Sequence, residues 1–421
     1  MPNLEKTVSD YMYDKTYNDP DVARKRLLQA YKAYAFKLRY FPDKNLPKSR
    51  QYLGRISMDH IIRAYDHPEQ SALTSLFMPN EINKAFGLHD LCAEQFAAYI
   101  GGAWSTKAYV EIAERAGIAE TFCSYHKILM GAAVQGILPK PKVIVNTSLA
   151  CDANNLSFRA ISNLYGVPQY YVDVPYTQSP AAVEYVADQL RKLVPWLEEH
   201  TGRKFDEQAF HEAILNSKHT IENMQEVLRL KKDHYLPTTL TCELYETLAL
   251  HGGLGSKESL RYSEKLLHDY RHAEARPGKR ILWMHTNPFG QNCVKELFNE
   301  SEKYQLIAGD INFDSLVDMD PDHPFESMAR RLVYDIINGP VTNRINGVRK
   351  TADALDIDGI ICFCHWGCKE TCGASSLIKE QLEQAGYPTL ILNGDGVDPS
   401  NRNDGQTQTR VEAFLEMLER D

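Results

Sequence analysis

The chain has 421 residues, 43% of them hydrophobic, which is enough apolar material for a large core divided over two or three domains. Its net charge of −9 gives no sign of the basic surface that binds nucleic acid. The N-terminal stretch MPNLEKTVSDYMYDK lacks an apolar signal-peptide core, and no apolar run approaches the roughly 20 residues of a membrane span, so we expect a cytoplasmic globular protein without membrane contact.

Residues 1–85 are predicted to form a helical N-terminal arm. The stretch DPDVARKRLLQAYKAYAFKLRYFPDKN opens on Asp19 and Pro20, carries apolar residues near helical period and stops at Pro42. From about residue 95, short β-branched runs alternate with helical stretches, a pattern typical of parallel sheets covered by helices on both faces. The expected strands are AAYIGG, KVIVNTS, QYYVDVPY, RILWMHT, YQLIAGDI, GIICF and PTLILNGDG.

A long amphipathic and charged segment, from AAVEYVADQL to MQEVLRL, separates the two groups of strands and is expected to be helical. The pattern therefore predicts an α/β protein with two lobes, residues 86–235 with a helical extension and residues 236–421 with a helical linker. Near the C-terminus, Thr409 and Glu412 have the spacing of a capping box at the start of the last helix.

The nine cysteines divide into two groups by their position relative to the predicted strands. In open α/β sheets, ligands bind at the carboxyl ends of strands, so cysteines in the following loops are candidate ligands. Three others lie inside predicted helices or strands and are expected to be buried core thiols: Cys92, Cys242 and Cys362. The six candidates, in loops or at strand ends, are Cys123, Cys151, Cys293, Cys364, Cys368 and Cys372.

The stretch FCHWGCKETCG sets three of these cysteines at steps of four residues. Structural zinc sites usually take cysteines as pairs, and a third cysteine at the same step is unusual for them. Ligation of an iron–sulfur cluster by thiolates from several loops fits the spacing better, while zinc and plain core thiols stay open as alternatives. The glycine-rich HGGLGSKES matches neither common nucleotide-binding spacing, so any use of ATP would come from a partner.

Two regions of the chain resemble a known superfamily. The segment from HWGCKETCG to RVEAFLEML is similar to the C-terminal signature of 2-hydroxyacyl-CoA dehydratase and benzoyl-CoA reductase subunits, and FCSYHKILMGAAVQGILPKPKVIVNTSLACD is similar to their first two cysteine regions. The resemblance implies two Rossmann-like (flavodoxin-like) lobes around an interlobe site. It also implies a [4Fe-4S] cluster held by Cys123, Cys151 and Cys368, with the fourth iron open to substrate or water.

Three further candidates, Cys293, Cys364 and Cys372, depart from the dehydratase pattern. Six thiolates around one site resemble the double-cubane cluster proteins of the same superfamily, which implies an [8Fe-9S] cofactor; Cys362 is a possible replacement for Cys364. The resemblance also implies a homodimer that takes electrons from a separate ATP-hydrolysing iron–sulfur reductase and reduces small molecules. The alternatives are a dehydratase subunit with one [4Fe-4S] cluster, and a zinc or structural protein.

Three side chains near the candidate cysteines are predicted to take part in catalysis: His126, His365 and Lys369. A histidine beside a cluster is suited to deliver the proton that follows each electron. Hydrogen bonding to backbone or sulfur is the alternative role for each of the three.

Overall fold

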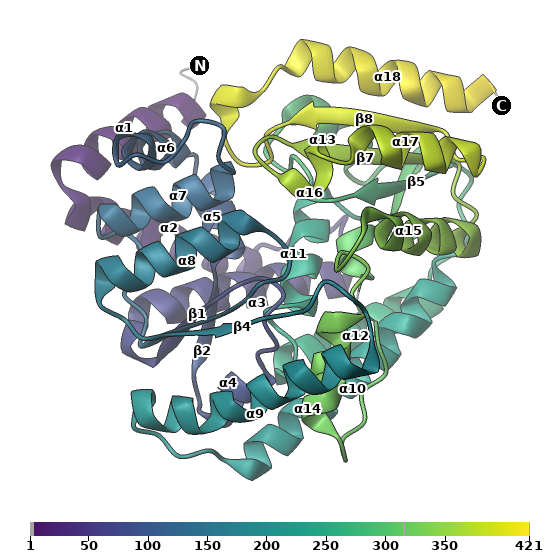
Figure 1. The fold of residues 1–421 in the computed structure, drawn as a ribbon. Coiled ribbons are helices and arrows are strands. Elements are labelled where there is room, and N and C mark those ends of the chain that lie inside the picture. The colour runs from purple at the N-terminus through teal and green to yellow at the C-terminus, as the bar shows by residue number, and fades with distance from the viewer. Residues whose placement is uncertain (1–3, 315, 421) are drawn as a thin grey trace.

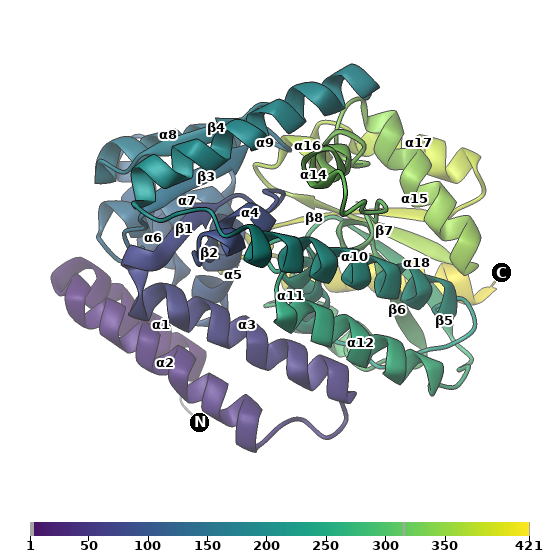
Figure 2. The same cartoon turned by 90° about the horizontal axis from the view of Figure 1, so that it is seen from below.

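The computed structural model describes residues 4–314 and 316–420 and consists of two α/β lobes beside a layer of N-terminal helices (Figure 1). The predicted helical arm is formed by α1 (Leu4–Asn18), α2 (Pro20–Tyr40) and α3 (Lys48–Asp66). Asp19 caps α2 by accepting the Val22 N–H, and Pro20 occupies the first turn, where no N–H is needed. Figure 2 shows these three helices side by side along one edge of the molecule.

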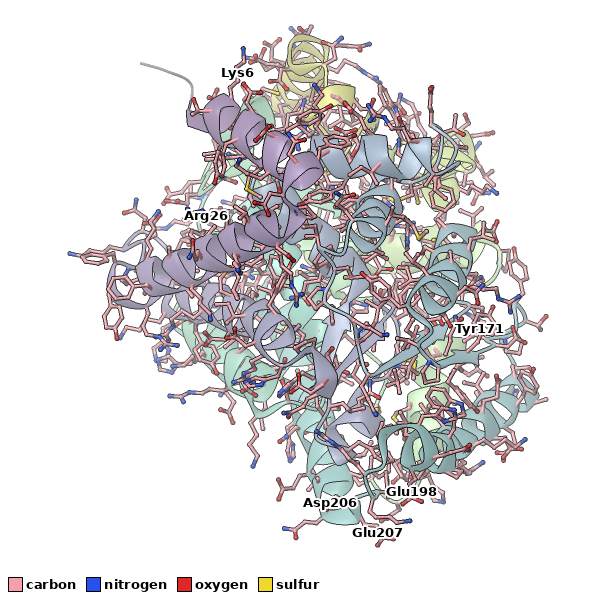
Figure 3. All side chains as sticks on the ribbon, turned by 90° about the vertical axis from the view of Figure 1, so that its left-hand side faces the viewer. Lys6, Arg26, Tyr171, Glu198, Asp206 and Glu207 are labelled. Carbon is pink, nitrogen blue, oxygen red and sulfur yellow. The ribbon has the colours of Figure 1, made fainter. Side chains whose placement is uncertain are left out.

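The first sheet has four parallel strands in the order β2-β1-β3-β4. They are β1 (Ser71–Thr74), β2 (His89–Cys92), β3 (Val143–Thr147) and β4 (Gln169–Val172). The central strand β3 is buried throughout, as expected for a parallel strand covered on both faces. The edge strand β4 carries Tyr171 at the surface of the molecule, which Figure 3 shows.

The second sheet repeats this arrangement with four parallel strands in the order β6-β5-β7-β8. They are β5 (Lys279–Met284), β6 (Tyr304–Gly309), β7 (Gly359–His365) and β8 (Thr389–Gly394). In both sheets the second strand along the chain lies outside the first, and the third and fourth lie on its other side. This order is that of flavodoxin-like sheets, and it confirms the predicted fold class of two Rossmann-like lobes.

Helices cover the sheets and connect the lobes. In the first lobe, α14 of the second half of the chain packs against α9, so the two halves of the sequence are interleaved (Figure 1). Arg331 of α14 forms a buried ion pair of 2.7 Å with Glu81 of α4. Within the described residues no helix is both long and apolar enough to cross a membrane.

The remaining helices are α4 (Glu81–Ala85), α5 (Ala93–Gly102), α6 (Thr106–Arg115), α7 (Ser124–Val134), α8 (Asp152–Tyr165), α9 (Pro180–Thr201), α10 (Glu207–Leu230), α11 (Leu240–Leu250), α12 (Lys257–Arg271), α13 (Asn292–Phe298), α14 (Pro324–Val333), α15 (Val341–Leu355), α16 (Lys369–Cys372), α17 (Ser375–Gln384) and α18 (Asp404–Arg420), with short 3₁₀ turns at Pro68–Gln70, Asp310–Asn312 and Pro399–Asn401.

Three local predictions were wrong. The run AAYIGG is the second half of helix α5, which is buried almost all round, and a short apolar run does not distinguish a buried helix from a strand. Strand β1 lies inside the segment predicted to be wholly helical, because four residues at a sheet centre leave little periodic signal. Helix α18 already begins at Asp404, so Thr409 does not cap it; its hydroxyl donates to the Gly405 carbonyl inside the helix.

Candidate functional site

A cavity of about 130 Å³ lies between the two sheets. Its walls come from the segments that follow the strands: Leu76 and Phe77 after β1, His285 after β5, and Ile311 after β6. Helix α11 closes another side, with Leu244 and Leu248 among its lining residues. The cavity therefore occupies the place where flavodoxin-like sheets bind their ligands, with both lobes contributing.

Three of the six candidate cysteines, Cys123, Cys151 and Cys368, line this cavity together. Each is the N-cap residue of a helix, namely of α7, α8 and α16. Helix N-termini present free backbone N–H groups and the positive end of the helix dipole, and both stabilise a thiolate. The three loops thus bring three thiols to one interlobe space, each with backbone N–H groups at hand for a thiolate.

Burial opposes ionisation of these thiols. It raises the pKa of the Cys123 thiol well above its ordinary value, and the N–H groups of His126 and Tyr125 counteract this only in part. Burial likewise raises the pKa of Cys151 to about 12 and raises that of Cys368. A bound metal reverses this rise in pKa, because the metal charge deprotonates a coordinating thiol. Buried neutral thiols at helix N-caps are therefore suited to be ligands.

The cavity walls also carry polar atoms that lack a partner. Asn154 Oδ1 and Asn287 Oδ1 are buried without a hydrogen bond within the described residues, and both side chains line the cavity. Buried polar atoms are almost always paired, so these indicate a polar occupant of the space. No three His, Cys, Asp or Glu side chains of the described chain surround a single-ion position. A cluster, with one cysteine on each of several irons, accommodates thiols spread around a wider space. The residues present fit such a group.

Gly367 sets the position of the loop that carries Cys368. Its φ of +81° lies in the left-handed region that favours glycine. A Cβ at this position would lie 2.6 Å from the backbone nitrogen of Cys123, closer than atoms of neighbouring residues approach. The loop after β7 therefore passes directly against the start of α7, and glycine permits both the turn and the contact.

His365 and His126 both line the cavity beside the thiols. His365 Nδ1 accepts the Gly396 N–H at 3.1 Å, so the ring proton of the neutral histidine resides on Nε2. That Nε2 lies 3.4 Å from Cys123 Sγ and can donate to it. His126 Nδ1 is 2.8 Å from the Ser157 hydroxyl. Burial lowers the pKa of His126 to about 4, so this imidazole is neutral at physiological pH.

The other predicted site residues lie outside the cavity lining. Cys364 points to the face of β7 opposite to that of His365. Its thiol is adjacent there to those of Cys362 and Cys372. Cys293 on α13 lies 3.9 Å from Asp404 Oδ1. Lys369 is 80% exposed and forms a surface ion pair of 3.2 Å with Asp152. The structure thus brings Cys123, Cys151, Cys368 and the two histidines together, and it places the added cysteines elsewhere around β7 and α13.

Several ionisable side chains of the cavity were not predicted from the sequence, among them His285, Arg344, Glu94 and Glu370. Arg344 donates to Asp310 at 2.8 Å, and one of its nitrogens lies 3.5 Å from His285 Nδ1. His285 directly follows β5, so the rule that selected the cysteines at strand ends would also have selected it. Arg344 lies on α15 within an ordinary amphipathic pattern and gave no such signal.

The fold and site define a two-lobed α/β protein with a three-thiol centre between its lobes. The sequence model of the family "2-hydroxyglutaryl-CoA dehydratase, D-component" matches residues 75–418, and the chain therefore belongs to this family. This confirms the superfamily that the cysteine regions predicted, and with it an enzyme of dehydratase or oxidoreductase type.

The relatives are components of dehydratases and reductases. The lactoyl-CoA dehydratase subunit alpha of Anaerotignum propionicum is 24% identical over 81% of this chain and 89% of its own length. The (R)-phenyllactyl-CoA dehydratase alpha subunit of Clostridium sporogenes is 21% identical over 88% of this chain and 96% of its own. A benzoyl-CoA reductase subunit of Thauera aromatica is 21% identical, with 82% of this chain and 89% of its own length covered.

Proposed function

We propose that this chain is the substrate-converting component of a low-potential iron–sulfur enzyme, with a cluster held by Cys123, Cys151 and Cys368. The observation that carries the proposal is that these three thiols, each at a helix N-cap, line one interlobe cavity. Once bound there, a [4Fe-4S] cluster with three protein ligands supplies single electrons and one iron position open to a small molecule.

The surrounding residues hold and tune this centre. His365 donates from Nε2 toward Cys123 Sγ, and hydrogen bonds to ligand sulfurs adjust the potential of a cluster. His126 is the residue that we assign to proton transfer in the cavity: it is neutral and held by Ser157, so it takes up a proton on its free ring nitrogen and then passes that proton on. Lys369 acts indirectly in this proposal, because its ion pair with Asp152 connects the loop of Cys368 to the helix that follows Cys151.

An [8Fe-9S] double cubane, with Cys293, Cys364 and Cys372 as additional ligands, is the second candidate. It is favoured by the presence of two further thiols, Cys364 and Cys372, in contact with each other on the segment that also bears Cys368. Loading a second cubane would require these two thiols and Cys293 to turn toward the first cluster. In that form we propose reduction of small unsaturated or nitrogen-containing molecules; with a single cubane, 2-hydroxyacyl-CoA dehydration is the closer parallel to the named relatives.

Electrons would come from a separate ATP-hydrolysing iron–sulfur reductase, because the sequence contains no recognisable phosphate loop. Trp366, 46% exposed, lies on the same loop as Cys368 and offers an aromatic contact for a partner close to the cluster. We propose a homodimer in the cytoplasm as the working form.

Anaerobic analysis of iron, acid-labile sulfide and zinc in the purified protein tests this proposal. About four irons per chain, the content of one cubane, support the single-cluster enzyme, and about eight support the double cubane. Zinc without iron or sulfide would contradict both and leave a structural zinc protein.

A further inference from the structure

A second, separate cavity of about 480 Å³ lies between α3, the start of α12 and the glycine-rich turn at residues 251–256. It opens beside the cluster cavity, and Leu248 of α11 lines both. None of the candidate cysteines lines it. Any ligand of this cavity would therefore be distinct from the iron–sulfur group.

The charge of this second cavity is opposite to that of the chain. The whole chain carries a net charge of −9. The cavity walls nevertheless contain five cationic side chains against two carboxylates, an excess that attracts anions. The cations are Arg39, Arg55, Arg63, Lys84 and Arg261, and the carboxylates are Asp59 and Glu258.

Both carboxylates are already engaged by other arginines. Asp59 pairs with Arg39 at 3.3 Å, and Glu258 pairs with Arg63 at 3.6 Å. Lys84 pairs with the buried carboxylate of Asp90. The unpaired positive charge of the cavity is thus concentrated on Arg55 and Arg261.

Arg55 and Arg261 have no carboxylate partner within residues 4–314 and 316–420. Both guanidinium groups instead lie over the ring of Tyr52, at 5.5 and 5.7 Å from its centroid, and Lys265 lies 5.8 Å from the same ring. Three cations around one tyrosine repel one another, and an anion between them removes that cost. Paired guanidinium groups match the oxygens of phosphate better than any other side chains do.

Two histidines, His60 and His89, also line this cavity. Burial, together with the positive charge of Lys84, lowers the pKa of His60 to about 3. Burial and the nearby Arg63 and Lys84 also lower the pKa of His89. Both imidazoles are therefore neutral and can donate a hydrogen bond to an anion without adding charge.

We propose that this second cavity binds a small molecule with adjacent phosphate groups, held by Arg55 and Arg261. The glycine-rich turn, with Gly253 and Ser256 in the lining, gives such a ligand close access to the backbone at the start of α12. Binding there involves no hydrolysis and does not depend on the cluster, so this inference goes beyond the function proposed above. A free nucleotide and the phosphate-bearing part of a larger substrate share this chemistry.

Calorimetric titration of the purified full chain with inorganic pyrophosphate, at about 0.1 M salt, tests the proposal. We expect saturable binding that weakens as salt screens the charges. Arg55→Gln and Arg261→Gln should each weaken it about tenfold or more, the effect of losing a hydrogen bond to a charged group. The matched control is Arg26→Gln, since Arg26 is exposed on α2 (Figure 3) and does not line the cavity.

Circular dichroism and thermal unfolding check that each variant is folded, and the two single variants give independent tests. The proposal would be overturned if the parent chain did not bind pyrophosphate, or if both arginine variants bound it as tightly as the parent does. Titrations with ADP and with coenzyme A then identify the source of the phosphates: binding of ADP alone indicates a nucleotide, and tighter binding of coenzyme A indicates a substrate tail.

Discussion

The backbone of Gly367 lies against the backbone of Cys123, so closely that a Cβ on Gly367 would approach the Cys123 nitrogen to 2.6 Å. Gly367 belongs to the second lobe and Cys123 begins a helix of the first. This contact places Cys368 beside Cys123 across the lobe boundary. The three-thiol centre therefore depends on a glycine that has no chemistry of its own.

Gly367→Ala should release most of the iron from the protein. The substitution adds a methyl group where there is no space, and it strains a residue with φ of +81° by about 1–3 kcal/mol. Gly386→Ala is the matched control, because Gly386 has φ of +93° but no atom within 4 Å of its added Cβ. Iron content of both variants, measured anaerobically, separates the contact from backbone strain; equal retention would show that the contact is dispensable.

Replacing Cys293, Cys364 or Cys372 by Ser distinguishes the two cluster forms. If a double cubane is present, each variant should lose about half of its iron while Cys123, Cys151 and Cys368 retain the rest. If these thiols only fill space, serine should cost about 1 kcal/mol of stability and no iron. Iron and sulfide counts beside the parent decide between the two, and full retention in all three variants excludes the double cubane.

The pure chain should show no sustained ATPase activity, because its sequence contains no recognisable phosphate loop. Reduction of a substrate should require an added ATP-dependent electron donor. Phosphate release is measured with the chain alone, with the donor alone and with both. Steady ATP hydrolysis by the chain alone would contradict the proposal that a separate reductase hydrolyses ATP.

The buried ion pair between Glu81 and Arg331 should make stability depend on acid pH. Burial opposes the charge of Glu81, but Arg331 and the Ser217 hydroxyl outweigh it and hold the pKa below its ordinary value of 4.5. A depressed carboxyl pKa contributes stability above pH 4.5, and this contribution is lost as the pH falls through the folded-state pKa. Denaturant unfolding at a series of pH values should show this loss in the parent chain.

Arg331→Met should cost about 3–5 kcal/mol at neutral pH, because it leaves the Glu81 carboxylate buried without a partner. The loss should become smaller in acid, where Glu81 takes up a proton. Lys379→Met removes one member of a half-exposed pair with Glu383 and should cost at most about 1 kcal/mol. A similar cost for both variants would contradict the importance assigned to the buried pair.

Much of the fold could be predicted because buried parallel strands leave apolar runs such as VIVNT and GIICFCH that periodicity detects. Strand β1 could not, since its four residues carry no period, and α5 was misassigned because burial on nearly all sides removes the helical pattern. Strand-end positions identified Cys151 and Cys368 as neighbours. Arg344 enters the cavity only through tertiary packing, which a single sequence does not encode in a readable pattern.

The iron content of Cys123→Ser, Cys151→Ser and Cys368→Ser variants tests the central claim most directly. Each variant, purified anaerobically, should lose most of its iron and sulfide, because the cluster would keep only two of the three cavity thiols. Cys242→Ser should keep the iron of the parent, since Cys242 is a buried thiol that does not line the cavity. Parental iron content in all three cavity variants would contradict a cluster held by these residues.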